Sequence, residues 1–325
     1  MKAIDVKQGT DGDTGIWYSV PYADYAAWPG VSRGRLWTLY SETPAHYRWE
    51  ADHPEEVVTP AMREGEAIHT AILEPDSFAN RYDDDAPINP RTEKPYGTDT
   101  KKFEEWAAAC EARGVRPLPP GLMEHYEAIG AAVHAHPVAG PLIRSTKHEV
   151  SIQWRHGPTG LLLKGRPDAV GETKDGLILV DLKSTRSAAP QRFGRDAYTN
   201  GYVWQLATYR MGLQAVTQQE VAQVLVLAIE KQPPYGVALY EAGPGDLAMG
   251  EDQVTDALRQ LQLCERYKDW PCYPEGVEDL ILPGWAGQEW TPFADGLEMT
   301  LQARAKRAGR PLPAAPPDDD DVIAL

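Results

Sequence analysis

The hydrophobic positions in the middle of the chain predict a β-hairpin. Two apolar runs, residues 161–163 and 177–180, flank a turn-forming stretch at residues 171–176. Short apolar runs on either side of such a turn are typical of paired strands. We therefore expect a first strand that ends near Asp168 and a second strand that continues past residue 180.

Asp181 and Lys183 are predicted to share one face of the second strand, because side chains alternate between the two faces of a strand. The apolar neighbours face the opposite side: Ile178, Val180 and Leu182. A carboxylate and an ammonium group at the end of a buried strand cost desolvation free energy unless other groups pair with them. One reading is a surface ion pair on an edge strand. The other is a metal site with Asp168 and Asp181 as oxygen ligands and Lys183 beside a water, which the second aspartate favours.

Helical periodicity is expected on both sides of this hairpin. Thr59 is a good N-cap and Pro60 suits the first helical position. The helix that they begin carries four residues at helical spacing on one face: Met62, Glu66, His69 and Leu73. Further helices are predicted after Ser32 and over residues 103–113, 122–136, 198–213 and 246–270. Further strands are predicted over residues 149–155, 221–230 and 236–240.

Five features follow one another along the chain. They are a G-x-x-x-H motif that ends at His69, then Glu149, Asp168, a D-x-K motif that starts at Asp181, and a Q-x-x-x-Y motif that starts at Gln205. In this order they resemble the PD-(D/E)xK nuclease superfamily, and more closely the phage and prophage exonucleases related to exonuclease VIII (RecE). The resemblance implies an α/β, restriction-endonuclease-like core with a mixed central sheet flanked by helices. It extends from about residue 28 to about residue 285.

The resemblance also implies roles for individual residues. Lys183 would orient or help to deprotonate the attacking water, and Gln205 and Tyr209 would position the scissile strand. One or two Mg²⁺ ions, for which Mn²⁺ substitutes, would be held by five groups: Asp168, Asp181, the backbone carbonyl of Leu182, Glu149 and His69. From the residues alone, Glu149 is equally a solvent-facing residue at a strand start. The alternative for Gln205 and Tyr209 is helix packing, and a single histidine such as His69 on a helix face is usually a core residue.

Several basic and aromatic residues are candidates for contacts with DNA. Residues 83–102 form a polar stretch without apolar periodicity. Within it, Arg91, Lys94 and Tyr96 are expected to contact a DNA strand by charge and stacking, with an ordinary solvated loop as the alternative. Arg166 and Arg186, next to the predicted metal ligands, are further expected DNA contacts.

Composition and charge limit the classes of function. The 325 residues carry a net charge of −16, which argues against general binding to polyanions. Between residues 144 and 195, however, the sequence contains ten Lys and Arg residues and only five Asp and Glu residues. A basic groove on an acidic body is compatible with DNA binding. The three cysteines lack C-x-x-C spacing and cannot ligate a four-cysteine iron–sulfur cluster, and no apolar run has the length of a membrane span.

We expect a flexible N-terminus at residues 1–15, a single nuclease domain at residues 16–308 with its catalytic core at about 59–241, and a disordered acidic tail at residues 309–325. The tail combines four aspartates with an apolar tip after a proline-rich linker. A passive solubilising tail, a tail that recruits a partner, and a tail that competes with DNA for the basic groove all remain open.

The resemblance implies 5′→3′ digestion of linear duplex DNA, which leaves 3′ single strands for a RecT-like annealing protein. It also implies a homo-oligomer, with a ring as one candidate form, in the cytoplasm of a bacterial host, encoded by a phage or prophage. Two alternatives are an endonuclease of the same fold and a catalytically silent protein that binds DNA ends. A paired-carboxylate glycosidase is remote, because Lys183 has no role in such a site.

Overall fold

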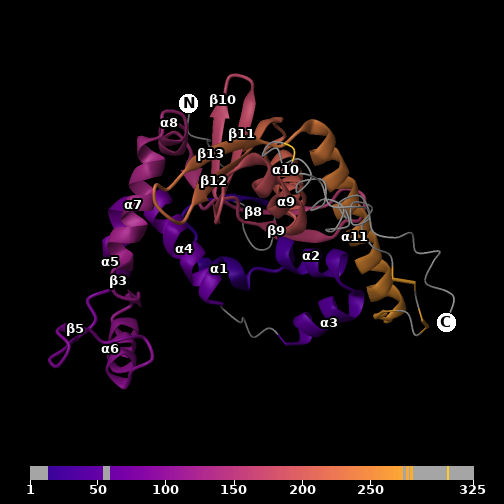
Figure 1. Cartoon of the computed structure of the whole chain (residues 1–325). Helices are drawn as coiled ribbons and strands as arrows, with labels where there is room; N and C mark the ends of the chain where they lie inside the picture. Colours follow the sequence, from indigo (N-terminus) through magenta and orange to yellow (C-terminus); the bar gives the residue numbers. More distant parts are fainter. Residues whose placement is uncertain (1–13, 54–58, 274–275, 278, 281–305, 307–325) are drawn as a thin grey trace. The chain divides into compact units, whose positions relative to one another are not determined.

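The computed structural model describes residues 14–53, 59–273, 276–277, 279–280 and 306 (Figure 1). The predictions for most of the flexible N-terminus and for the acidic tail lie outside these residues. The chain divides into two compact units, residues 1–272 and residues 273–325, and the elements labelled in Figure 1 belong to the first.

Short strands and helices alternate along the first half of the chain, and longer ones follow. The strands are β1 (Gly15–Trp17), β2 (Val31–Ser32), β3 (Tyr82–Asp83), β4 (Ile88–Asn89), β5 (Lys94–Pro95), β6 (Arg116–Pro117), β7 (Lys147–His148), β8 (Ser151–Arg155), β9 (Leu162–Gly165), β10 (Ala169–Thr173), β11 (Gly176–Thr185), β12 (Val221–Glu230) and β13 (Val237–Glu241). The helices are α1 (Tyr22–Ala27), α2 (Arg33–Ser41), α3 (Pro44–Asp52), α4 (Pro60–Leu73), α5 (Pro75–Arg81), α6 (Lys101–Ala112), α7 (Leu122–Ala135), α8 (Ala139–Arg144), α9 (Pro190–Thr199), α10 (Tyr202–Thr217) and α11 (Pro244–Tyr267).

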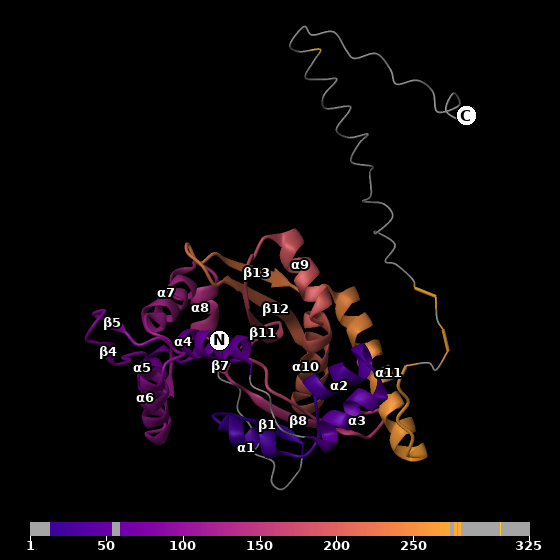
Figure 2. The same ribbon diagram turned by 60° about the horizontal axis from the view of Figure 1, so that its bottom comes forward.

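A mixed sheet of five strands forms the centre of the molecule, in the order β13-β12-β11-β10-β7. Strand β11 pairs antiparallel with β10 and parallel with β12, and β13 closes the other edge antiparallel to β12. In Figures 1 and 2, α4 and α7 lie on one side of this sheet, and α10 and α11 lie on the other. The predicted fold class, a mixed central sheet flanked by helices, is therefore confirmed.

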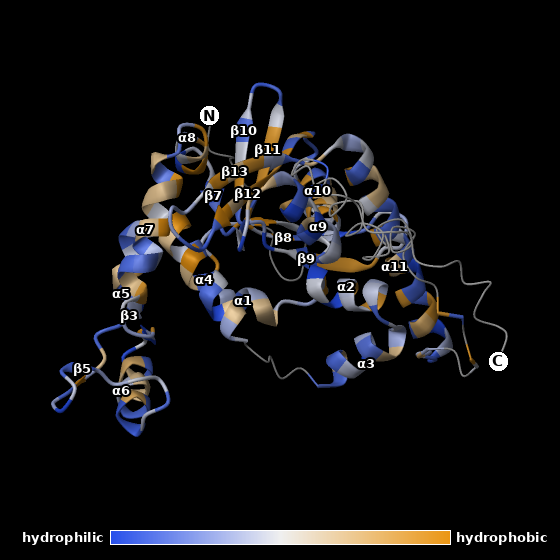
Figure 3. Ribbon diagram, in the orientation of Figure 1, coloured by the Kyte–Doolittle hydropathy of each residue, from blue (hydrophilic) through white to orange (hydrophobic). Residues whose placement is uncertain are grey.

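The alternation of side chains along β11 builds two hydrophobic cores. Leu177 and Leu179 belong to the core that includes Trp204 and Leu206 of α10. The intervening residues face the core that contains Ile68 of α4 and Ile129 of α7: Ile178, Val180 and Leu182. Figure 3 shows the resulting hydrophobic strands, with a hydrophilic turn at the tip of the β10–β11 hairpin. Asp181 and Lys183, in phase with Leu179, therefore point toward α10.

The predicted hairpin is wrong in its first strand, because the strand that contains the first apolar run does not pair with β11. Strand β9, which contains residues 162 and 163 of the 161–163 run, belongs to a separate four-stranded sheet in the order β1-β8-β9-β2. The partner of β11 is β10, and residues 166–168 connect β9 to it. Proline has no backbone N–H to donate, so Pro167 interrupts strand pairing just before Asp168. The turn is also shorter than expected, because Thr173 already pairs with Gly176.

The predicted helix at residues 198–213 is in fact the end of one helix and most of the next. Gly201, with φ +63°, is the N-cap of α10, and Pro190 occupies the first turn of α9. A glycine adopts this left-handed conformation without the steric cost that a Cβ atom imposes. By contrast, the predicted cap of α4 is confirmed, since Thr59 Oγ1 accepts a hydrogen bond from the N–H of Met62 at 3.2 Å.

Residues 83–102, which were predicted to be an irregular loop, contain the short β4–β5 hairpin and the start of α6. Figures 1 and 2 both place this hairpin and α6 beyond the end of α5, away from the five-stranded sheet. None of the helices in the described residues combines the length and the apolar character that a membrane span requires.

Candidate metal centre

Asp168 and Asp181 meet where β10 begins to pair with β11. Ala169 pairs with Val180, so Asp168 lies just before the first paired residue and Asp181 lies just after the last. Strand β10 covers one edge of β11 only as far as Val180, and beyond Val180 the same edge is open to other groups. Asp168 occupies it, because its Oδ2 accepts a hydrogen bond of 2.6 Å from the N–H of Leu182.

Two side chains from separate parts of the chain gather around Asp168. The ligating atoms of His69, Glu149 and Asp168 all lie within 4.8 Å of one another. His69 extends from α4, and its Nδ1 lies 3.7 Å from Asp168 Oδ1. The sequence motif thus places its histidine beside the aspartate, as the metal reading requires.

Glu149 reaches this cluster through an unusual backbone conformation. Its φ of +51° marks the point where the chain leaves β7 in one sheet and enters β8 in the other. Its N–H donates to the carbonyl of Asp168 at 2.8 Å, and the next N–H donates to the carbonyl of Pro167 at 3.0 Å. The predicted strand start at residue 149 is therefore wrong, since β8 begins two residues later.

The environment of Asp168 raises the pKa of its carboxyl to about 7. Burial is the largest cause, and the neighbouring charges of Asp181 and Glu149 act in the same direction. His69 and Lys183 lower it, but by less than the sum of the other effects. A carboxyl group surrounded by other carboxylates in a buried position is one that a cation would stabilise in its charged form.

Asp181, Lys183 and Gln205 form a second group of contacts on the α10 side of the sheet. Lys183 Nζ lies 2.5 Å from Asp181 Oδ2 and donates to Gln205 Oε1 at 3.2 Å. Gln205 Nε2 in turn donates to Asp181 Oδ1 at 3.0 Å and to the hydroxyl of Tyr209 at 3.3 Å. The D-x-K and Q-x-x-x-Y motifs, 22 residues apart between Lys183 and Gln205, therefore form one network.

The residues present fit a divalent cation. Asp181 Oδ2 is buried without a hydrogen bond, although it lies beside the Lys183 ammonium. A buried carboxylate oxygen in this state has capacity for a further positive partner. Carboxylate oxygens with one imidazole nitrogen form a donor set suited to Mg²⁺ or Mn²⁺, since these hard ions favour oxygen ligands.

The carbonyl of Leu182 also faces this cluster. In a β-strand, the N–H and C=O of one residue point to the same edge. Because the N–H of Leu182 donates to Asp168, its carbonyl points toward the same open edge of β11. This geometry is compatible with the ligand role that the resemblance implies for it.

The predicted DNA-binding residues lie in three different places. Arg166 is engaged within the protein, because its Nε donates to Glu149 Oε2 at 2.6 Å and its guanidinium lies 5.6 Å from the ring centroid of Tyr25. Arg186 is exposed directly after β11, the strand that carries Asp181 and Lys183. The remaining three are on or next to the distant β4–β5 hairpin: Arg91, Lys94 and Tyr96.

Two tyrosines at the site were missed in the sequence. The ring of Tyr202 faces Lys183 Nζ at 4.9 Å from the ring centroid, and Tyr25 covers Arg166. Tyr202 is three residues before Gln205 on α10, so helical spacing alone was a usable signal for it. Tyr25 carried no such signal, because it lies in a separate helix more than a hundred residues earlier.

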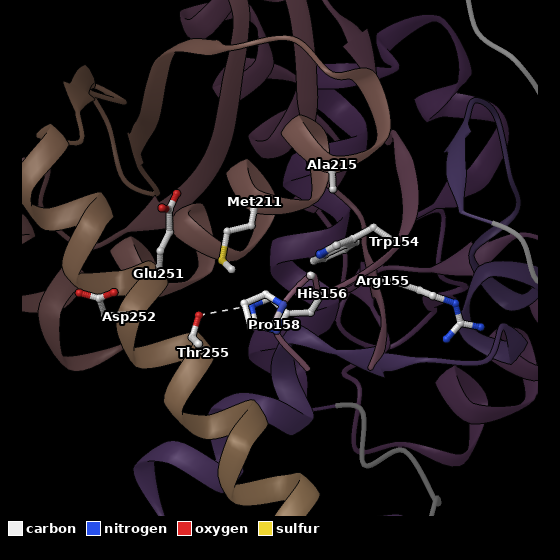
Figure 4. Close-up of a pocket in the computed structure, with 10 residues that line it drawn as sticks. Trp154, Arg155, His156, Pro158, Met211, Ala215, Glu251, Asp252 and Thr255 are labelled. Carbon is white, nitrogen blue, oxygen red and sulfur yellow. Dashed lines mark hydrogen bonds between the residues drawn. The ribbon is translucent and has the colours of Figure 1, made fainter. Parts of the chain in front are cut away.

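The cavity in Figure 4 is separate from this centre. It has a volume of about 350 Å³ and lies between β8, α10 and α11. The dashed line in the figure joins His156 Nε2 to Thr255 Oγ1, which are 3.3 Å apart. None of its lining residues belongs to the cluster around Asp168 or to the network around Lys183.

Two solved structures illustrate the comparisons with known folds. A protein of Eubacterium rectale described as a “Putative exonuclease” is 13% identical, with 81% of this chain and 94% of that chain covered and a TM-score of 0.49. An alkaline exonuclease of Laribacter hongkongensis is 16% identical, with 53% and 85% covered and a TM-score of 0.26. No curated protein matches the chain. Because both TM-scores are below 0.5, membership of a family rests on the sequence comparison alone.

That comparison matches one family over residues 39–282, which is most of the 325 residues. The match includes the elements that carry both the cluster around Asp168 and the network around Lys183. The family is described as a PDDEXK-like domain of unknown function (DUF3799), so the predicted PD-(D/E)xK relationship is confirmed. The chain belongs to this family of PDDEXK-like domains.

Proposed function

We propose that this protein is a divalent-metal-dependent exodeoxyribonuclease that hydrolyses linear double-stranded DNA. The observation that carries the proposal is the convergence of Asp168, Asp181 and Lys183 at the open edge of β11, with His69 and Glu149 completing a cation-binding set. The protein therefore combines a cluster able to hold a metal with a lysine, Lys183, that contacts one of the carboxylates, Asp181.

Asp168, Asp181, Glu149, His69 and the carbonyl of Leu182 would hold the metal. A divalent cation supplies charge neutralisation at the scissile phosphate and makes a neighbouring water more acidic. The carboxylates supply the negative charge that binds the ion. Most of them are buried or half-buried, which strengthens every charge interaction in the centre.

Lys183 would orient the attacking water and offset the negative charge that develops on the phosphate. Its ammonium is directed by three neighbours: the Asp181 carboxylate, the Gln205 amide and the ring of Tyr202. A positively charged donor that is already positioned stabilises the transition state without reorganising during the reaction. Gln205 would hold this arrangement and the scissile strand, and the hydroxyl of Tyr209 would position the Gln205 amide.

The finer assignments rest on the resemblance to exonuclease VIII. They are 5′→3′ polarity, release of 3′ single strands for a RecT-like annealing protein, a ring-shaped oligomer and use of Mg²⁺ with Mn²⁺ as a substitute. Contacts to DNA from Arg186, Arg91, Lys94 and Tyr96 belong to the same proposal, whereas the Arg166 guanidinium is already engaged by Glu149, Ser151 and Val20. Among the proposed contacts, Arg186 has the best support, because it is exposed at the end of β11.

The test is incubation of the purified protein with linear, nicked and covalently closed duplex DNA, with Mg²⁺, Mn²⁺, Ca²⁺ or EDTA. An exonuclease degrades only substrates that have an end, and Ca²⁺ supports binding without cleavage because its looser coordination positions water poorly. Cleavage of closed circles would instead identify an endonuclease. Binding to ends without hydrolysis under any metal would identify a catalytically silent end-binding protein.

A further inference from the structure

Helix α9 lies in the chain between the D-x-K strand and the Q-x-x-x-Y helix. Its inner side is fixed by Phe193, which is buried and stacks on Tyr240 with 5.1 Å between ring centroids. The chain two residues before α9 is fixed as well, because the N–H of Ala188 donates to Glu230 Oε1 at 2.8 Å. A surface on α9 therefore has a defined position relative to the sheet.

Two aromatic contacts connect α9 to the catalytic candidate. The rings of Phe193 and Tyr202 lie 6.0 Å apart between centroids. Tyr202 in turn places its ring 4.9 Å from Lys183 Nζ. Figure 2 shows α9 directly before α10, next to β13. A molecule bound along α9 would thus lie next to the Lys183 network.

The outward side of α9 carries three residues spaced three positions apart: Arg192, Arg195 and Tyr198. This spacing places them on one face of a helix. All three are exposed, and the Tyr198 side chain is 85% exposed. We call these three residues, together with the exposed Arg186 that precedes the helix, the α9 face.

The charge of this segment is opposite to that of the chain. Residues 186–198 contain three arginines and a single acid, Asp196, whereas the whole chain has a net charge of −16. A local positive surface on an acidic protein attracts a polyanion to that place and not elsewhere. Arginines bind phosphates, and an exposed tyrosine ring offers a base a surface on which to stack.

We propose that the α9 face binds the unpaired DNA strand next to the candidate metal centre. Arg186 and Arg192 would contact phosphates, and Tyr198 would stack on one base. The strand is unpaired in this assignment, because a base stacks on a side chain only when that face of the base is free. The inference rests on the proposed function and adds the surface that guides the strand.

The test measures binding of a fluorescein-labelled single-stranded oligonucleotide and of a blunt duplex of the same sequence, by anisotropy in EDTA. Tyr198→Ala should weaken binding of the single strand at least about fivefold, and Tyr198→Phe should restore it. The double variant Arg186→Ala/Arg192→Ala should reduce the slope of log K against log salt concentration by about 1.4, which is about 0.7 for each phosphate contact.

Matched controls come from α11, where Arg259 and Tyr267 are also exposed. Arg259→Ala and Tyr267→Ala should leave both the affinity and the salt slope unchanged. All the variants replace exposed side chains, and equal melting temperatures would confirm that each is folded. Equal losses on the blunt duplex and on the single strand would overturn the assignment to an unpaired strand.

Cleavage of linear DNA by the wild-type protein with Mn²⁺ separates the two proposals. If the wild type binds and cleaves, and the α9 variants bind with unchanged affinity and salt slope, the inference is wrong and the proposed function stands. If the wild type neither binds nor cleaves DNA, the proposed function is wrong and the inference fails with it.

Discussion

Gln205 accepts a hydrogen bond from Lys183, with 3.2 Å between Oε1 and Nζ. Because the amide nitrogen of Gln205 donates to Asp181 at 3.0 Å, each end of this amide has a partner of the appropriate sign. The ammonium and carboxylate groups of the D-x-K motif are in contact with each other, and the glutamine bridges them and fixes both. This relationship makes Gln205 a positioning residue for the lysine.

Gln205→Ala should slow cleavage by about 10- to 100-fold, the range typical of residues that orient metal-site groups. It should leave the melting temperature nearly unchanged, because the amide makes no contribution to the hydrophobic core. Rate and melting measured on the same samples test this. Gln214→Ala, on the same helix but outside the network, is the control. A large fall in melting temperature for Gln205→Ala would indicate a packing role.

Lys183→Ala should lower the cleavage rate by several orders of magnitude. The substitution removes the group that orients the attacking water and offsets the negative charge on the phosphate. Binding of linear duplex should survive, since the cluster around Asp168 is unaltered. Lys174→Ala is the matched control, because this lysine is exposed in the turn of the same hairpin. A cleavage rate near that of the wild type for Lys183→Ala would show that the D-x-K assignment is wrong.

Tyr209 should prove to be a packing residue whose hydroxyl assists Gln205. It is buried, and its ring lies 3.0 Å from where a Cβ atom on Gly165 would stand. Tyr209→Ala should reduce the free energy of unfolding by about 3–5 kcal/mol, as removal of a buried aromatic ring does. Tyr209→Phe should lose only the 3.3 Å contact with Gln205, with a small change in rate and none in melting. Urea unfolding and nuclease rates distinguish these outcomes, and a silent Tyr209→Ala would refute the packing role.

Arg166→Ala should weaken metal binding and stability more than it changes the salt dependence of DNA binding. Its guanidinium holds Glu149, Ser151 and the carbonyl of Val20, so truncation leaves the Glu149 carboxylate without its partner. The expected loss of stability is roughly 1–3 kcal/mol. Calorimetric titration with Mn²⁺ and urea unfolding measure both effects. If the main change were instead a salt slope lower by about 0.7–0.9, Arg166 would be a phosphate contact.

The carboxyl of Asp168 should make the metal-free protein less stable as pH rises. Its pKa is raised from 3.8 in the unfolded chain to about 7 in the folded protein. The folded state therefore holds a proton that the unfolded state has released, and its stabilising contribution is complete below pH 3.8 and lost as pH rises through about 7.

Comparison with Asp168→Asn isolates this contribution, because the amide does not titrate. In EDTA, the stability of the wild type relative to the variant should fall by on the order of 2 kcal/mol between about pH 5 and about pH 8. Added Mn²⁺ should restore the wild type at the higher pH and leave the variant unaffected. A difference that stays constant across this range would refute the shifted pKa.

The sequence by itself determined the features that depend on local periodicity. Alternation along β11 placed Asp181 and Lys183 on one face and Leu182 on the other, because strand geometry repeats every two residues. The threonine cap of α4 and the i, i+4 pair of Gln205 and Tyr209 are local for the same reason. The order of the motifs was enough to identify the superfamily.

Only the tertiary structure decided which side chains share the centre. Pro167 separates β9 from β10, so the strand before Asp168 lies in a different sheet from Asp181, which no apolar run revealed. Glu149 reaches Asp168 through a left-handed backbone and pairs with Arg166, and Tyr202 covers Lys183. These contacts depend on how two sheets and several helices pack, and packing is set by the whole core rather than by any short segment.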